Sequence, residues 1–146
     1  MQLTLHTDYS LRTLIYLNYL KEDQTATINE VADYYQISHN HLMKVVYHLS
    51  KKGYIKSIRG KKGGIKLAKP AAEINIGQVV REMEPNFHIV ECFNPEATPC
   101  NIAPHCSLIP VLREAANSFM SVLDQHTLGS VIDSMPQWKP INLKLD

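Results

Sequence analysis

The fold of this chain is decided by residues 27–53, TINEVADYYQISHNHLMKVVYHLSKKG. Thr27 followed by Glu30 is a capping-box pattern, which predicts that a short helix begins there. A turn is expected next, after which Ser38 is expected to cap a second helix over residues 39–52. Two short helices joined by a tight turn are typical of a helix-turn-helix, so this stretch predicts a DNA-binding unit.

The second of these helices has an apolar face and a polar face. Its apolar residues repeat at helical spacing, which predicts a buried stripe of Leu42, Val45, Val46 and Leu49. Side chains at the start and on the outer face of a recognition helix reach base edges in the major groove. We therefore expect DNA contacts from the polar residues there, namely Ser38, His39, Asn40, His41 and Lys44. Gly53 then suits the left-handed position that ends a helix.

Two short, partly alternating segments, residues 54–59 and 64–68, predict a pair of strands. The run Gly60-Lys-Lys-Gly63 between them predicts a basic hairpin turn. A hairpin directly after a helix-turn-helix is a wing. We expect its basic residues to enter the minor groove or contact the phosphates beside it, and these are Arg59, Lys61 and Lys62.

The charge distribution favours the same kind of partner. The net charge is only +1, but nine of the fifteen Lys and Arg residues lie within residues 44–69. No Asp or Glu occurs between Asp33 and Glu73, so ordinary surface ion pairs within this stretch are not expected. A basic surface of this kind suits a polyanion such as double-stranded DNA. The alternative is a solvated lysine-rich face.

A first helix is expected over residues 7–20, with Thr7 as its cap and Asp8 near its positive end. Asp8 and Arg12 are four residues apart, so they share a face of this helix and can pair. Another helix is expected later in the chain, with Asn75 as its cap, a buried stripe at Ile76, Val79, Val80 and Met83, and a stop at Pro85.

A long helix is expected from Ser107, its cap, to about residue 125, followed by a short helix from Thr127. The long helix has a very wide apolar face, which a chain this small cannot easily cover by itself. We interpret it as the dimerisation element of a homodimer. Dimerisation also suits a helix-turn-helix that reads a palindromic operator.

These elements predict a mainly α fold with a small β-hairpin: a winged helix-turn-helix with a long dimerisation helix. The expected organisation is a DNA-binding domain at 1–84, a cysteine-rich loop at 85–106, the dimerisation and short helices at 107–134, and a tail at 135–146 without a readable signal.

All the cysteines of the chain lie within fifteen residues, at Cys92, Cys100 and Cys106. Prolines at three positions between them exclude a regular helix or strand, so the thiols are expected on one irregular loop. Soft thiolates favour zinc, copper(I) or an iron–sulfur cluster. The spacing C-x7-C-x5-C is not the C-x2-C of zinc ribbons or of thiol redox motifs.

Three thiolates leave a four-ligand site one ligand short. Candidates for the fourth ligand are His88 and His105 on the loop, Asp8, or another residue, including one from the partner subunit. An oxygen ligand on iron would be weakly held and would leave an exchangeable position, as a sensor of a small molecule requires.

The sequence also bears on other classes of function. A zinc-based or thiol-redox regulator with the same DNA-binding unit is the alternative, since three close thiols allow one disulfide. No nucleophile elbow, phosphate loop or paired-carboxylate pattern is present in the sequence, so an enzyme is not expected. The sequence has no apolar run long enough to span a membrane and no signal peptide, so we expect a cytoplasmic protein with reduced thiols.

The sequence resembles, nearly end to end, the family of dimeric winged-helix iron–sulfur regulators. The motifs that carry the resemblance are Leu3-Thr-x3-Thr7-Asp8-Tyr9-x-Leu11-Arg12, Ser38-x-Asn40-His41-x-x-Lys44, Gly53-Tyr54, Arg59-Gly60-Lys61-x-Gly63-Gly64-Ile65 and the three cysteines. Ser10 replaces a small apolar residue common in the family. One group of members has a histidine three residues after the last cysteine; Ile109 stands there in this chain, so the nitric-oxide-responsive repressors are the more similar group.

The resemblance implies a cluster held by Cys92, Cys100 and Cys106, with Asp8 of the partner subunit as the fourth ligand. A [4Fe–4S] cluster is favoured over [2Fe–2S]. It also implies a repressor that releases its operator when nitric oxide attacks the cluster. Arg12 is then the expected partner of Asp8 once this carboxylate is released.

Overall fold

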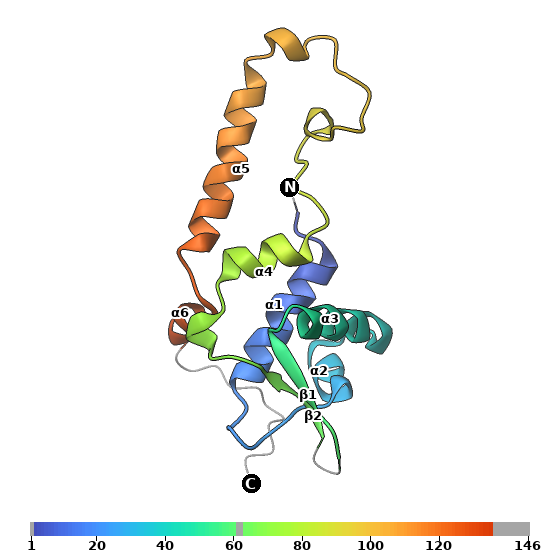
Figure 1. Ribbon diagram of the computed structural model, residues 1–146, viewed down its shortest axis with the longest axis vertical. Coiled ribbons are helices and arrows are strands. Elements are labelled where there is room, and N and C mark those ends of the chain that lie inside the picture. The colour runs from blue at the N-terminus through green and yellow to red at the C-terminus, as the bar shows by residue number, and fades with distance from the viewer. Residues whose placement is uncertain (1, 61–62, 136–146) are drawn as a thin grey trace.

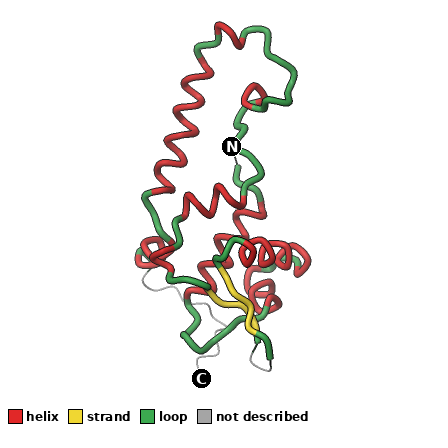
Figure 2. Tube along the Cα trace, in the orientation of Figure 1, coloured by secondary structure: helices red, strands yellow, loops and turns green. Residues whose placement is uncertain are grey.

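The computed structural model describes residues 2–60 and 63–135 of the 146-residue chain. The tail beyond residue 135 and the two lysines at the hairpin tip lie outside this description. The predicted fold class is confirmed, because the described chain is mainly helical with one two-stranded hairpin (Figures 1 and 2). Its helices are α1 (Leu5–Asn18), α2 (Ile28–Tyr35), α3 (His39–Lys51), α4 (Ile76–Met83), α5 (Leu108–Asp124) and α6 (Leu128–Asp133).

The helix-turn-helix forms as its capping residues predict. Thr27 Oγ1 accepts a hydrogen bond from the Glu30 amide at 3.1 Å, and Glu30 Oε2 accepts one from the Thr27 amide at 2.6 Å, which completes the capping box of α2. Gln36 adopts a left-handed backbone with a φ of 54° and turns the chain toward α3. Ser38 then caps α3 by accepting a hydrogen bond from the His41 amide at 3.2 Å.

We call the unit formed by α1, α2, α3, α4 and the hairpin the head. Its core lies between α1, α3, α4 and the hairpin. The predicted stripe of α3 is buried there, in one hydrophobic cluster with Leu14 and Leu17 of α1 and Val79 and Val80 of α4. Full burial of one such side chain stabilises the fold by about 1.5–3 kcal/mol. The expected stripe of α4 is also confirmed, since Ile76, Val79, Val80 and Met83 are all buried.

Strands β1 (Ile55–Ile58) and β2 (Gly64–Leu67) form the predicted antiparallel hairpin, in which Ile55 pairs with Leu67. Ile55 and Ile65 are buried and anchor the hairpin to the head. The segment before α2 adds to the anchor, because the Ala26 amide donates to the Ile65 carbonyl at 3.0 Å and the Ile65 amide donates to the Ala26 carbonyl at 2.7 Å. The hairpin therefore has a fixed base.

The start of α1 differs from its prediction. Thr4 is the cap, and its hydroxyl accepts a hydrogen bond from the Thr7 amide at 3.3 Å, whereas Thr7 itself is fully buried within the helix. The reason is a distant carboxylate. Glu84, at the end of α4, accepts hydrogen bonds from the Thr4 amide at 2.7 Å and the Thr4 hydroxyl at 3.1 Å, which holds the earlier threonine at the helix start.

The cysteine segment and α5 leave the head. Between α4 and α5 the chain forms two 3₁₀ turns, Glu91–Phe93 and Ala103–His105, and otherwise runs irregularly (Figure 2). Ser107 was expected to cap α5 but makes no capping hydrogen bond, because its backbone is already helical (φ −72°, ψ −10°). The short helix expected from Thr127 forms as α6, with Thr127 as its cap, and α6 returns to the head, where Leu128 is fully buried. Within the described residues, no helix is long and apolar enough to cross a membrane.

The capping box of α2 gives a test of the fold. Replacing Thr27 with Ala removes the hydroxyl that accepts from Glu30, so we expect the free energy of unfolding to fall by about 1 kcal/mol. Urea denaturation followed by circular dichroism measures this. Thr98→Ala, in the exposed cysteine segment, is the matched control and should leave stability unchanged. Equal stability of both variants would show that the box does not stabilise the head.

Candidate nucleic-acid interface and cysteine loop

Helix α3 presents a polar surface to solvent. All five residues expected to read DNA from this element are exposed, and they are Ser38, His39, Asn40, His41 and Lys44. The Ser38 hydroxyl is also the cap of the helix. Met43 and Tyr47 lie on the exposed side of the same helix, with 44% and 63% of their surface accessible. Met43 is three residues after Asn40 and Tyr47 is three residues after Lys44, so helical spacing places them beside the predicted contacts.

A hollow of about 360 Å³ lies between the hairpin and the helix-turn-helix. It brings together the start of α2, the start of α3 and the outer part of the hairpin, with Thr27, Asn29, His39, Ser57, Ile58 and Gly64 among its lining residues. Exposed backbone amides at helix starts favour anionic groups such as phosphates. Asn29 and Ser57 were not singled out from sequence. Their only signal was their position at the start of α2 and on β1.

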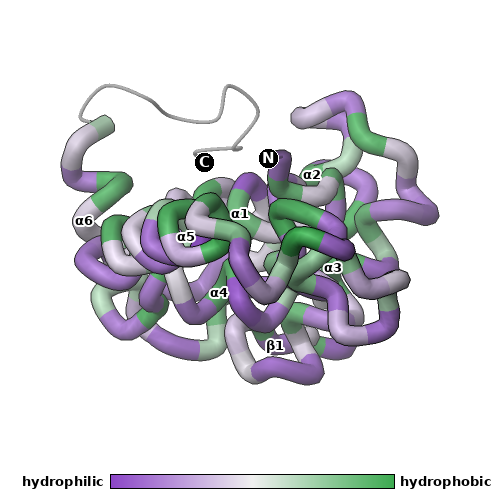
Figure 3. Tube along the Cα trace, turned by 90° about the horizontal axis from the view of Figure 1, so that it is seen from above, coloured by the Kyte–Doolittle hydropathy of each residue, from purple (hydrophilic) through white to green (hydrophobic). Residues whose placement is uncertain are grey.

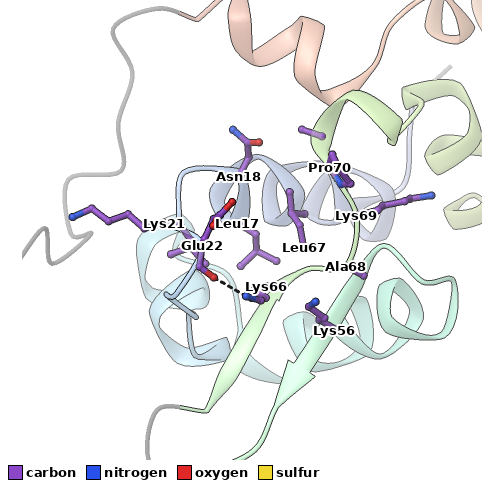
Figure 4. A pocket seen from close by; sticks show the side chains of 12 residues that line it. Leu17, Asn18, Lys21, Glu22, Lys56, Lys66, Leu67, Ala68, Lys69 and Pro70 are labelled. Carbon is purple, nitrogen blue, oxygen red and sulfur yellow. Dashed lines mark hydrogen bonds between the residues drawn. The ribbon is translucent and has the colours of Figure 1, made fainter.

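The basic run of residues 44–69 divides into parts with different surroundings. Arg59 is exposed at the end of the hairpin, while the predicted contacts Lys61 and Lys62 lie outside the described residues. Lys56, Lys66 and Lys69 instead line a hollow of about 520 Å³ between the hairpin and the end of α1 (Figure 4).

Two lysines of this hollow have partners within the chain. Lys66 Nζ donates to the Glu22 carbonyl at 2.7 Å (Figure 4), and Lys69 Nζ lies 4.7 Å from the centre of the Tyr54 ring. Part of the basic run therefore makes contacts within the head and is not free for DNA.

Asp8 lies in the first turn of α1 and is paired with Arg12, as predicted. Arg12 Nε donates to Asp8 Oδ1 at 3.0 Å, and Arg12 Nη2 lies 2.6 Å from Asp8 Oδ2. Both side chains are partly exposed, at 37% for Asp8 and 46% for Arg12. An ion pair with this much solvent exposure is weak, so the carboxylate is available for exchange with another partner.

The beginning of α1 also contacts the recognition helix. His6 Nε2 and His48 Nδ1 are 3.0 Å apart, and the two rings meet edge to face. Burial lowers the pKa of His6, and the positive charge that His48 would carry lowers it further. A neutral His6 can share a proton with His48, which links the helix of Asp8 to α3. No local sequence pattern predicts this contact, because the residues are 42 positions apart.

The three cysteines are free thiols. Cys92 and Cys100 are exposed and Cys106 is half-buried. Across residues 2–60 and 63–135, no three His, Cys, Asp or Glu side chains are grouped closely enough to hold a metal ion. His88 and His105, the candidate fourth ligands of the loop, are exposed and belong to no such group. The donor chemistry fits an iron–sulfur cluster, since three unpaired thiols share one irregular segment.

Helix α5 has none of its residues buried. Leu108, Val111 and Val122 are each more than half exposed, at 58%, 58% and 55%. Viewed from above, hydrophobic and hydrophilic residues both occur around this helix (Figure 3). An apolar surface of this extent on a long helix is typical of a protein–protein interface.

A winged helix-turn-helix with an exposed polar recognition helix defines a DNA-binding transcription regulator. The chain belongs to the Rrf2 family, described as iron-dependent transcriptional regulators, whose model matches residues 3–134. The family and the relatives below are named as transcription regulators, which confirms the expectation that the chain is not an enzyme.

Similar proteins include the HTH-type transcriptional regulator NsrR of Bacillus licheniformis, 49% identical over 132 residues, which cover 90% of this chain and 92% of that protein. NsrR of Bacillus subtilis is 47% identical over 132 residues, or 90% of each chain. Solved structures with the same fold include IscR of T. potens, with a TM-score of 0.73, 20% identity and coverage of 95% of this chain and 93% of that one. CymR, the global cysteine regulator of B. subtilis, has a TM-score of 0.72, 22% identity and coverage of 92% and 98%.

Proposed function

We propose that this chain is a homodimeric transcription repressor that senses nitric oxide through an iron–sulfur cluster and then releases a palindromic operator. The observation that carries the proposal is that all three cysteines are unpaired and lie on the one segment that joins the head to α5. The likeness to NsrR regulators along 90% of the chain supports it. A protein that acts on chromosomal DNA in this way works in the cytoplasm.

In this proposal Cys92, Cys100 and Cys106 hold the cluster, and Asp8 of the partner subunit completes it. A [4Fe–4S] cluster suits three thiolates and one carboxylate. When bound, the cluster supplies iron atoms that react with nitric oxide. The apolar surface of α5 supports the dimer that such cross-subunit ligation requires, and we propose α5 as its interface.

The residues of α1 supply the switch. Asp8 has two alternative partners, the cluster across the dimer or Arg12, with which it forms an ion pair on its own helix. Exchange between these partners moves the start of α1, which contacts α3 through His6 and His48. A ligand shifts a conformational equilibrium only through contacts that differ between the two states, and Asp8 provides such a difference.

The DNA contacts follow from exposure and position. We propose that Ser38, His39, Asn40, His41 and Lys44 face the major groove, and that Arg59, Lys61 and Lys62 enter the minor groove or grip its phosphates. A dimer places two such heads about one turn of DNA apart, which accounts for a palindromic operator.

The first experiment is to purify the protein without oxygen and record its absorption spectrum before and after adding nitric oxide. We expect a brown protein with a broad visible band that bleaches on addition, together with loss of operator binding. A colourless protein containing zinc, or no metal, would contradict the cluster and favour the zinc or thiol-redox alternative with the same DNA-binding head.

The role of Asp8 can be tested separately. Asp8→Ala should leave the cluster bound through the three cysteines but change its spectrum and blunt the loss of DNA binding on nitric oxide addition, because the ligand that connects the subunits is gone. Asp23→Ala, an exposed carboxylate in the turn after α1, is the control. A wild-type spectrum together with a wild-type response in Asp8→Ala would exclude Asp8 as a ligand.

Two substitutions separate base reading from backbone contact. Asn40→Ala should reduce discrimination between operator variants by about 1–3 kcal/mol, because an amide side chain pairs with base edges. Arg59→Ala should instead weaken binding to all sequences alike and reduce its salt dependence, as expected for a phosphate contact. Fluorescence anisotropy with operator variants at two salt concentrations measures both effects. Asn101→Ala, in the exposed cysteine segment, is the control; unchanged binding by both test variants would overturn the contact map.

A further inference from the structure

Helix α5 rises away from the head and meets it at its C-terminal end, where it packs on α4 (Figure 1). The last residue of α5, Asp124, is at the centre of this junction. Arg81 of α4 binds its carboxylate with both terminal nitrogens, at 2.5 Å from Nη1 to Oδ1 and 2.6 Å from Nη2 to Oδ2. Both side chains are partly exposed, at 45% for Arg81 and 41% for Asp124, so the pair adds little stability by itself. Its two-pronged geometry nevertheless restricts orientation as well as distance, because both groups are planar.

The backbone around Asp124 is held as well. Asn75 Nδ2 donates to the Asp124 carbonyl at 2.7 Å, while Asn75 Oδ1 accepts from the Gln78 amide at 2.9 Å. One side chain thus caps α4 and holds the end of α5. The next residues pair like a short strand, since the Ile76 amide donates to the His126 carbonyl at 2.9 Å and the Leu128 amide donates to the Ile74 carbonyl at 2.7 Å.

Gly77 makes this close approach possible. A Cβ atom at this position would overlap the Asp124 carboxylate and lie 3.0 Å from the Asp124 backbone nitrogen, so another residue would push this carboxylate out of its pair with Arg81 or shift the end of α5. This glycine lies within a regular helix, where glycine costs about 1 kcal/mol relative to alanine. The need for space beside Asp124 explains its presence there.

We propose that Asn75, Gly77, Arg81 and Asp124 form a joint that fixes the angle between α5 and the DNA-binding head, and thereby sets the half-site spacing that the dimer accepts. The inference rests on the proposed function, since it requires a DNA-binding dimer with α5 at its interface. These four are positioning residues, and none belongs to the predicted DNA or cluster contacts.

The length of α5 turns a small change of angle at the joint into a large displacement. A helix of 17 residues is about 25 Å long, so a change of about 10° at its base moves its far end by about 4 Å relative to the head. In a dimer the same change occurs twice, once in each subunit. One base pair adds about 3.4 Å to the length of DNA, which is similar to this displacement. A joint that permits such changes would therefore let the two recognition helices bind half-sites that are one base pair closer together or farther apart.

The test uses the full-length protein and an operator selected by the wild-type protein from random double-stranded DNA. Affinities are then measured for this operator and for versions with one base pair added or removed between the half-sites. We expect Asp124→Asn and Arg81→Gln each to lower the preference for the selected spacing by about threefold to tenfold, and the double variant to go no further. Asp133→Asn, an exposed carboxylate on α6, is the matched control and should keep the wild-type preference.

Sedimentation and circular dichroism accompany these measurements. Variants that stay folded and dimeric with the wild-type spacing preference would contradict the proposed role of the joint. Variants that become monomers would also contradict it, because the Arg81–Asp124 pair would then stabilise the dimer and not set the angle of α5. Gly77→Ala should act in the same direction; if it does not fold, Asp124→Asn decides. A wild-type protein that selects no DNA would overturn the proposed function and this inference with it, whereas a spacing-selective wild type with unchanged variants overturns the joint alone.

Discussion

The packing of α1 against the rest of the head is the constraint on which this structure depends. This helix contacts α3, α4, β2 and α6, so its face must be buried on several sides. Small hydroxyl residues allow that close packing. Thr7, Ser10 and Thr13 are fully buried. The Ser10 hydroxyl donates to the His6 carbonyl and the Thr13 hydroxyl donates to the Tyr9 carbonyl, both at 2.7 Å, so both of these buried hydroxyls are hydrogen-bonded. The serine at position 10 therefore fits a site where a small apolar residue is common.

Local sequence signals placed most of the elements. Thr27, Ser38 and Asn75 were identified as caps because an N-cap needs only a short polar side chain and an amide three residues on. Thr7 and Ser107 failed for reasons outside that local pattern. Glu84 holds the earlier Thr4, and the backbone of Ser107 is already helical. Tertiary contacts and backbone conformation therefore decide which residue caps a helix when the local pattern is insufficient.

The candidate site was only partly accessible from sequence. The clustering of the thiols and the pairing of Asp8 with Arg12 followed from spacing along the chain. The contacts that connect separate elements gave no such signal, because they join residues far apart, as in Arg81 with Asp124 and His6 with His48. In the proposed cluster site, the distances between ligands would likewise depend on the partner subunit and on the cluster, neither of which is encoded as a local pattern.

Helix α4 connects the start of α1, which carries Asp8, with the end of α5. It has only eight residues, about 12 Å, yet both of its ends bind other helices through capping groups. At its start Asn75 holds the end of α5, and at its end Glu84 holds Thr4 at the start of the helix that carries Asp8. A displacement of α1 therefore pulls on an element that is tied to α5 at its opposite end. Because packed helices move as rigid bodies, the proposed change of partner at Asp8 would have a short and continuous route to the angle between the head and α5.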